Sequence, residues 1–212
     1  MLAALARLFL DAVAPKRCAG CDAVSDRSIC ANCDASMHAL PLPAVRRMRQ
    51  GSGFAAFEFT GPVRAALHRG KYGGDRQALS ELAAMTTSRL GGPRLFTPDA
   101  VVAVPLGLRR RRQRGYNQAE LIASVIAEAR DVPVFDDLVR TRDTPPQTAR
   151  DEATRRGNVA GAFAWTGKAL DGAYLWLVDD VLTTGATVEA AAATLADAGA
   201  SLIDVVVVAA VS

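Results

Sequence analysis

Histidine and long apolar runs are scarce in this chain, and each scarcity excludes a class of function. The 212 residues contain two histidines, His38 and His68, and neither stands in a context typical of a catalytic base. A Cys–His or Ser–His nucleophile is therefore not expected. No stretch reaches the roughly 18 consecutive apolar residues that a membrane span needs, so we expect no membrane insertion.

Two common phosphate-binding fingerprints are also missing. The chain has no Gly-Lys-Ser/Thr sequence of a Walker A loop and no GxGxxG dinucleotide fingerprint. Lysine is rare as well: only Lys16, Lys71 and Lys168 are lysines among the 25 basic residues. The remaining basic residues are arginines, and the planar arginine guanidinium suits phosphate and carboxylate better than the lysine ammonium. A biased genomic composition accounts equally well for this excess of arginine over lysine. The formal charge of +3 is too small to identify a partner.

The N-terminal segment has apolar residues at helical spacing and ends at Pro15. Arg7 and Asp11 interrupt the apolar run, and no basic segment precedes it, which argues against a signal peptide. The pattern predicts a short amphipathic helix packed on its own protein. We therefore expect a cytoplasmic location.

All four cysteines lie within sixteen residues, in the sequence CAGCDAVSDRSICANC. Two CxxC pairs at this spacing can hold four thiolates tetrahedrally around Zn²⁺. Two disulfides or a redox-active CxxC are the alternatives, and a cytoplasmic location disfavours the first. No fifth ligand is evident, so the zinc would be structural, with ligands Cys18, Cys21, Cys30 and Cys33.

A Pro-, Arg- and Gly-rich connector separates this module from the rest. We expect an N-terminal helix and zinc ribbon over 1–45 and a second domain over 46–212. There, apolar strands alternate with helices, as in an α/β fold with a parallel sheet. We predict a turn at 70–75, and Trp165 and Trp176 in the core. The expected strands are 54–59, 99–107, 174–180 and 201–212, and the expected helices start near Thr60 and cover 76–90, 119–130 and 187–199.

Two polar motifs follow predicted strands at their carboxyl ends, where α/β sheets bind ligands. The first motif, Arg109 to Gln118, follows the strand at 99–107. The second begins with Asp179 and Asp180 at the end of the strand at 174–180 and continues into a small, hydroxyl-rich turn that opens a helix. Backbone N–H groups, threonine hydroxyls and the helix dipole together form a phosphate cradle. A ribose 5-phosphate fits, with its phosphate in the turn and its hydroxyls on the carboxylates. A helix-capping acid beside a surface acid explains neither the doublet nor the three threonines.

The sequence LWLVDDVLTTGAT resembles the phosphoribosyl pyrophosphate (PRPP) motif of type I phosphoribosyltransferases. Together with CAGC…CANC, VPLGLRRRRQRGYNQAELIA and RRGNVAGAF, it makes the chain similar to the ComF family of competence-associated proteins over roughly residues 15 to 210. The resemblance implies a type I phosphoribosyltransferase-like parallel sheet flanked by helices, behind a small zinc ribbon.

The resemblance also implies roles for individual residues. Asp179 and Asp180 would hold the ribose hydroxyls, directly or through Mg²⁺, and the turn after VVAVP would be the pyrophosphate loop. Mg²⁺ and nearby cations would stabilise the departing pyrophosphate. The implied ligand-binding residues are Val181, Leu182, Thr183, Thr184, Gly185, Ala186 and Thr187, with Arg109, Arg110, Arg114 and Lys71 as candidates for the diphosphate.

Several assignments stay open at this point. The arginine run is a pyrophosphate contact, a nucleic-acid patch, both, or a solvated surface. Tyr116 and Asn117 are more typical of residues that cap and position the following helix than of ligand contacts. The polar segment 140–158 suggests a lid, with Gln147, Arg150, Arg155, Arg156 and Asn158 as candidates to close over the ligand.

Two functions fit these features. The first is a Mg²⁺-dependent phosphoribosyltransferase that transfers ribose 5-phosphate from PRPP to an unknown acceptor, possibly a nucleobase. The second is a non-catalytic PRPP- or nucleotide-sensing accessory protein of DNA uptake and natural transformation. In that case the zinc ribbon and Arg46, Arg47 and Arg49 would hold single-stranded DNA. The family resemblance alone implies the link to competence, with single-stranded DNA and a competence helicase as partners.

Overall fold

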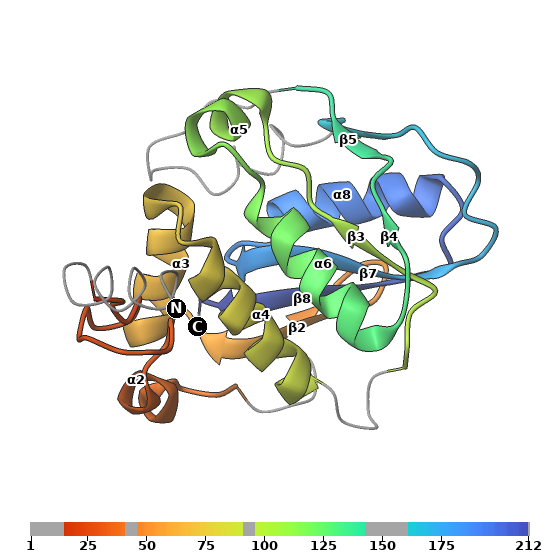
Figure 1. Ribbon diagram of the computed structural model, residues 1–212. Helices are drawn as coiled ribbons and strands as arrows, with labels where there is room; N and C mark the ends of the chain where they lie inside the picture. Colours follow the sequence, from red (N-terminus) through yellow and green to blue (C-terminus); the bar gives the residue numbers. More distant parts are fainter. Residues whose placement is uncertain (1–14, 41–45, 91–95, 143–160, 212) are drawn as a thin grey trace, which may run out of the picture.

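The computed structural model describes residues 15–40, 46–90, 96–142 and 161–211 of the chain. A six-stranded sheet forms its centre (Figure 1), and five of the strands run parallel while the edge strand β1 runs antiparallel to β2. The carboxyl ends of the parallel strands therefore meet at one edge, as expected. In spatial order the strands are β1 (Arg46–Arg47), β2 (Ser52–Glu58), β8 (Leu202–Ala210), β7 (Tyr174–Leu182), β3 (Ala100–Ala103) and β4 (Val134–Phe135).

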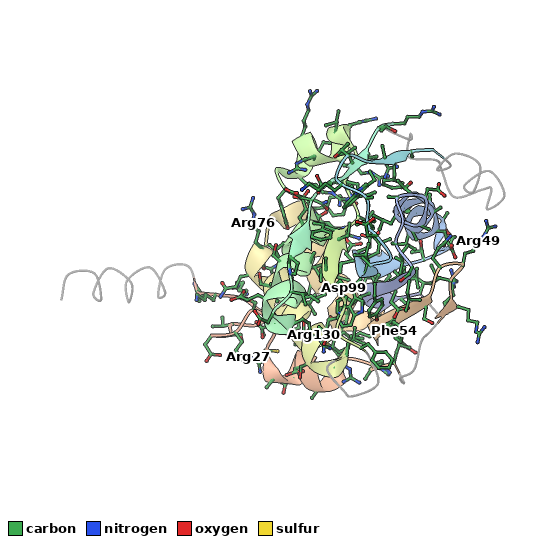
Figure 2. The ribbon with its side chains drawn as sticks, turned by 90° about the vertical axis from the view of Figure 1, so that its right-hand side faces the viewer. Arg27, Arg49, Phe54, Arg76, Asp99 and Arg130 are labelled. Carbon is green, nitrogen blue, oxygen red and sulfur yellow. The ribbon has the colours of Figure 1, made fainter. Side chains whose placement is uncertain are left out.

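Helices cover both faces of this sheet. Strands buried on both faces need nearly continuous apolar sequence, and β7 and β8 supply it. Trp176 and Val178 of β7 pack against α3, α4 and α6, whereas Leu175 and Leu177 pack on the opposite face, against α8. Figure 2 looks along α8 and shows it across the sheet from the helix that begins at Arg76. The longer helices are α3 (Gly61–Gly73), α4 (Arg76–Leu90), α6 (Gln118–Arg130) and α8 (Ala186–Asp197), and the shorter ones are α2 (Ala31–Ser36) and α5 (Leu108–Arg114).

The strands and helices predicted within the described residues are present, with corrections at two places near the site. The turn predicted at 70–75 is wrong, because α3 continues to Gly73 and ends at Gly74, whose φ of 69° suits a glycine C-cap. Lys71 therefore lies in the last turn of a helix. The strand predicted at 99–107 is shorter, since β3 ends at Ala103, and the arginine run after it forms the helix α5.

A second, two-stranded antiparallel sheet stands beside the main one. It pairs β5 (Leu138–Arg140) with β6 (Phe163–Trp165) and packs on the α8 side through Leu138 and Phe163. Trp176 is buried as predicted, but Trp165 of β6 is only half-buried and lines an open pocket of about 680 Å³ with Phe135. The predicted helix before Pro15 and the lid candidates Gln147, Arg150, Arg155, Arg156 and Asn158 lie outside the described residues.

The cysteine module packs directly on the main fold. Cys18, Ile29 and Cys33 are buried in the same apolar cluster as the α3 and α4 side chains. A Cβ on Gly20 would come within 2.9 Å of both Cys33 Sγ and Pro62 Cβ, so glycine is needed for this close approach. The boundary at residue 45 stays a prediction. Across the described ranges, no helix combines the length and apolarity that crossing a membrane requires.

Candidate functional site

The two adjacent carboxylates lie within β7, near its carboxyl end. Side chains of β7 alternate between the two faces up to Val178, but Val181 packs on the α3 side again, so the alternation breaks around the two aspartates. The side of Asp180 is given by its contact with Lys71 of α3. Asp180 is buried and Asp179 keeps partial contact with solvent. Asp180 thus reaches towards α3, and the Asp179 carboxyl lies close enough to Asp180 and Lys71 for their charges to act on it.

Asp180 forms an ion pair with Lys71 of α3. The Lys71 Nζ lies 2.7 Å from Asp180 Oδ2, and their side chains are 20% and 12% exposed. A charged pair this poorly hydrated requires close geometry to offset desolvation, and 2.7 Å supplies it. The structure thus brings Asp180 together with Lys71, the ligand-site candidate that lies farthest from it in the sequence.

Asp179 has a markedly perturbed acidity. Burial, and next the negative charge of Asp180, raise the pKa of the Asp179 carboxyl from 3.8 to about 7. Its Oδ1 accepts a hydrogen bond of 2.8 Å from the Asp180 N–H, which acts in the opposite direction. The positive charges of Lys71 and Arg140 oppose the rise in pKa as well. A carboxyl that titrates near neutrality in this position is typical of a functional site.

The hydroxyl-rich turn connects β7 to α8. Gly185 is the N-cap of α8 with φ 84°, a backbone conformation that disfavours any side chain. The Thr184 hydroxyl accepts a 3.5 Å hydrogen bond from the Ala186 N–H. The first N–H groups of a helix lack partners within the helix and carry the positive end of its dipole. The N–H groups of the first turn of α8, which begins at Ala186, therefore carry a positive potential. Ligand contacts by Thr183, Gly185, Ala186 and Thr187 stay predictions.

Two other predicted ligand residues precede the turn, inside the strand. Val181 and Leu182 end β7, and the Leu182 side chain is buried in the cluster on the α8 face. They are the last two residues of the strand and directly precede the turn. A ligand contact by either residue stays a prediction.

The predicted arginines of α5 divide into two groups. None of the α5 residues is buried, and Arg109 and Arg110 lie exposed at its start. Arg114, at its end, turns back onto the fold: its Nη1 donates to Gln118 Oε1 at 2.8 Å, and its guanidinium lies 5.1 Å from the centre of the Tyr72 ring. Arg114 thus contacts α6 and α3, and its α3 contact, Tyr72, is the residue next to Lys71.

The segment that follows α5 fastens three elements together. Asn117 is 3% exposed; its Oδ1 caps α6 through the Ala119 N–H at 3.1 Å, and its Nδ2 donates to Val104 O at 3.0 Å, just beyond β3. The Tyr116 hydroxyl donates to the carbonyl of Gly70 in α3. The expected capping role of this segment is confirmed, and it also holds the end of α3.

The four cysteines are positioned to bind a metal ion. Their sulfur atoms all lie within 4.8 Å of one another. Tetrahedral Zn²⁺ with thiolate ligands about 2.3 Å away separates neighbouring sulfurs by about 3.8 Å, and Cys21 Sγ lies 3.7 Å from Cys30 Sγ. The donor set and spacing fit structural zinc, and none of the four is disulfide-bonded.

The environment of Cys18 favours its thiolate. Cys18 Sγ accepts 3.3 Å hydrogen bonds from the backbone N–H groups of Gly20 and Cys30. Burial alone would raise the pKa of Cys18, but hydrogen bonds from the backbone of Cys30, Gly20 and Cys21 and from the Cys30 side chain lower it from 9.0 to about 6. Burial and the neighbouring thiols raise the pKa of Cys33. A cysteine must be a thiolate to bind zinc, and the backbone N–H groups that donate to Cys18 Sγ stabilise that form.

Comparison with known proteins gives related sequences. The chain is 30% identical over 156 residues to the DNA utilization protein YhgH of Salmonella typhi, covering 70% of this chain and 67% of that protein. The chain belongs to the ComF family. It is also 36% identical over 96 residues to Competence protein F of Haemophilus influenzae (44% of this chain, 42% of that protein) and 26% identical over 145 residues to Competence protein ComFC of Bacillus subtilis (68% and 58%). No protein-family model matches the sequence.

Solved structures similar to this ComF-family chain include phosphoribosyltransferases. Glutamine PRPP amidotransferase from B. subtilis is 21% identical with a TM-score of 0.43, over 62% of this chain and 26% of that one. The chain thus spans about a quarter of that enzyme. Adenine phosphoribosyltransferase from Saccharomyces cerevisiae is 18% identical with a TM-score of 0.39, over 65% and 69%.

Sequence reasoning missed two residues of this ComF-family site. Arg46 of β1 donates from Nη1 to Thr184 O at 2.7 Å, and a Cβ on Gly185 would lie 3.0 Å from the same nitrogen. Arg140, at the end of β5, lies near enough to act on the pKa of Asp179. Each arginine is more than 35 residues from its partner in the sequence and reaches it through strand pairing. The spacing of residues along the chain therefore could not predict these two contacts. The arginine-rich connector was interpreted only as a nucleic-acid patch.

Proposed function

We propose that this protein binds PRPP, or a related ribose 5-phosphate ligand, at the carboxyl edge of its sheet. The observation that carries the proposal is the meeting of three features there: a glycine-capped helix N-terminus, an acidic doublet and the buried Lys71–Asp180 pair. A 5-phosphate suits the N–H groups of the turn. The ribose hydroxyls suit the carboxylates, because these accept hydrogen bonds in their ionised form.

The proposed reaction is transfer of ribose 5-phosphate from PRPP to a nitrogen nucleophile, with loss of pyrophosphate. Asp179 and Asp180 hold the ribose as positive charge develops on it, and Lys71 and the α5 arginines balance the departing diphosphate. Mg²⁺ bound to the diphosphate oxygens would supply further charge neutralisation. Little acid–base catalysis is required, which agrees with the scarcity of histidine.

Release of pyrophosphate from PRPP tests the activity directly. The wild-type protein is incubated with PRPP and Mg²⁺ across a panel of nucleobases and amines, and pyrophosphate is measured by a coupled assay. We expect release with at least one acceptor and its loss in Asp180→Asn. Binding of PRPP without release from any acceptor would favour a sensing protein; no binding would refute the site assignment.

A second proposed function is binding of single-stranded DNA in DNA uptake. It is favoured by the exposed arginines of α5 and of the 46–49 segment, and by family members named for competence and DNA utilization. Such binding weakens steeply with salt, because phosphate contacts release counterions. Since the cysteine module shares the main core, substitution is a sharper test than deletion.

The second function is tested by fluorescence anisotropy of a labelled oligo-dT strand at several salt concentrations. Arg110→Glu with Arg112→Glu alters α5, and Arg47→Glu with Arg49→Glu alters the connector. Loss of affinity in either pair, with a shallower salt slope, locates the DNA contact. Wild-type binding weaker than millimolar at low salt would rule this function out.

A further inference from the structure

Lys71 differs from an ordinary surface lysine because the residues before and after it both contact other parts of the fold. Its neighbour Gly70 offers its carbonyl to the Tyr116 hydroxyl, and its neighbour Tyr72 lies against the Arg114 guanidinium. The Gly70 backbone also packs against Leu79 so tightly that a Cβ would approach its side chain to 2.5 Å. The last turn of α3 is thus fixed at three points around Lys71, and the ammonium is presented to Asp180 by a rigid support.

The acidic doublet is poorly arranged to chelate a metal by itself. The Asp180 carboxylate is already paired, and the Asp179 carboxyl is also acted on by the Lys71 charge. On the α3 side, the Lys71 ammonium already lies at hydrogen-bond distance from Asp180. Divalent cations of the Mg²⁺ type need several oxygen ligands, and here Asp180 is already paired with a cation of the protein.

We propose that Lys71 is a built-in cation of the ligand site, which occupies Asp180 in place of a divalent metal and reaches from there to the anionic ligand. An ammonium has three donors, and among the described residues Asp180 is its one ion-pair partner. Two donors therefore remain for oxygens of the ligand. The inference rests on the proposed function for the identity of that ligand.

Two consequences follow for metal dependence. The free protein binds divalent cations weakly, because Lys71 competes for Asp180. The phosphoribosyl ligand keeps much of its affinity without metal, because Lys71 supplies the positive charge locally. Any required Mg²⁺ then arrives on the diphosphate of the ligand rather than on the protein.

The first consequence is tested without any sugar phosphate. Mn²⁺ binding to the free protein is followed by electron paramagnetic resonance for wild type, Lys71→Met, Lys71→Arg and the matched control Lys168→Met. Lys168 lies exposed by the remote pocket of Phe135 and Trp165. We expect Lys71→Met to bind Mn²⁺ at least about tenfold more tightly than wild type, corresponding to about 1.4 kcal/mol, while Lys71→Arg and Lys168→Met stay at the wild-type value.

The second consequence is tested with PRPP, by calorimetry in EDTA and in Mg²⁺. We expect wild type to lose less than about fivefold in affinity on removal of Mg²⁺, and Lys71→Met to lose at least about tenfold. Equal Mn²⁺ affinities for wild type and Lys71→Met would overturn the inference. Wild type that binds no PRPP refutes the proposed function instead, and the Mn²⁺ result still decides the role of Lys71. If Lys71→Met does not fold, Lys71→Gln is measured in both arms.

Discussion

Replacing Asp179 by asparagine should stabilise the free protein at neutral and alkaline pH. The folded state raises the pKa of this carboxyl from 3.8 to about 7. The folded protein therefore holds the proton more tightly than the unfolded chain, and the ionised form costs stability. That cost is absent well below pH 4, grows as the pH rises towards 7, and is constant above it. Asparagine keeps an oxygen to accept the Asp180 N–H, so the local hydrogen bond survives.

The size of the gain follows from the shift. Each pKa unit corresponds to 1.36 kcal/mol, so about three units set an upper bound of about 4 kcal/mol. Because Asp179 keeps partial contact with solvent, we expect about half, or about 2 kcal/mol at pH 8. At pH 4.5 most of the cost has not yet developed, and the expected gain is about 1 kcal/mol or less.

Urea unfolding at pH 4.5, 6 and 8 measures this dependence. Asp136→Asn, at an exposed position beside β5, is the matched control and should show a pH-independent difference within about 0.5 kcal/mol. The reasoning is refuted if Asp179→Asn is no more stable than wild type at pH 8, or if its gain shrinks as the pH rises. We also expect the stabilised variant to bind the proposed ligand more weakly, because changes that stabilise a functional site commonly reduce its function.

Three further changes test the supports of the site. Asn117→Ala removes a helix cap and strands the buried Val104 carbonyl, so it should lower the free energy of unfolding by about 2–4 kcal/mol, whereas Asn117→Ser keeps the cap and should lose about half as much. Arg46→Ala should weaken ribose 5-phosphate binding about fivefold in calorimetry through a loosened turn, while Arg47→Ala, at the next position, leaves it unchanged. Zinc removal by a chelator should lower the melting temperature of the whole protein in a single calorimetric transition, because the cysteine module shares the main core; two separate transitions would contradict that.

The sequence predicted those parts of the fold that depend on local pattern. The apolar runs of β7 and β8 identified buried parallel strands, and the spacing of the four cysteines predicted that they cluster. The acidic doublet and the turn after it were placed at the correct edge of the sheet, because that edge follows from parallel topology. Each inference used residues that are close together in the chain.

The errors arose where tertiary contacts decide. Residues 70–75 have turn composition, but Tyr116 and Leu79 hold Gly70 and keep α3 helical through Lys71. The arginine run has good helix-forming residues between two glycines, and the structure makes it α5. The approach of Arg46 to the turn depends on β1 pairing with β2, and a two-residue strand leaves no periodic signal.

Calorimetric titration of PRPP, with Mg²⁺ present, into wild type, Gly185→Ala and Gly172→Ala tests the central claim most directly. Both glycines have φ 84°, so alanine strains the backbone equally, but Gly185 caps the proposed phosphate site and Gly172 lies beyond the opposite end of β7. We predict measurable heat for wild type and Gly172→Ala and at least a tenfold weaker affinity for Gly185→Ala. Absence of heat with wild type, or equal affinity in the two variants, would contradict the binding of a sugar phosphate at this turn.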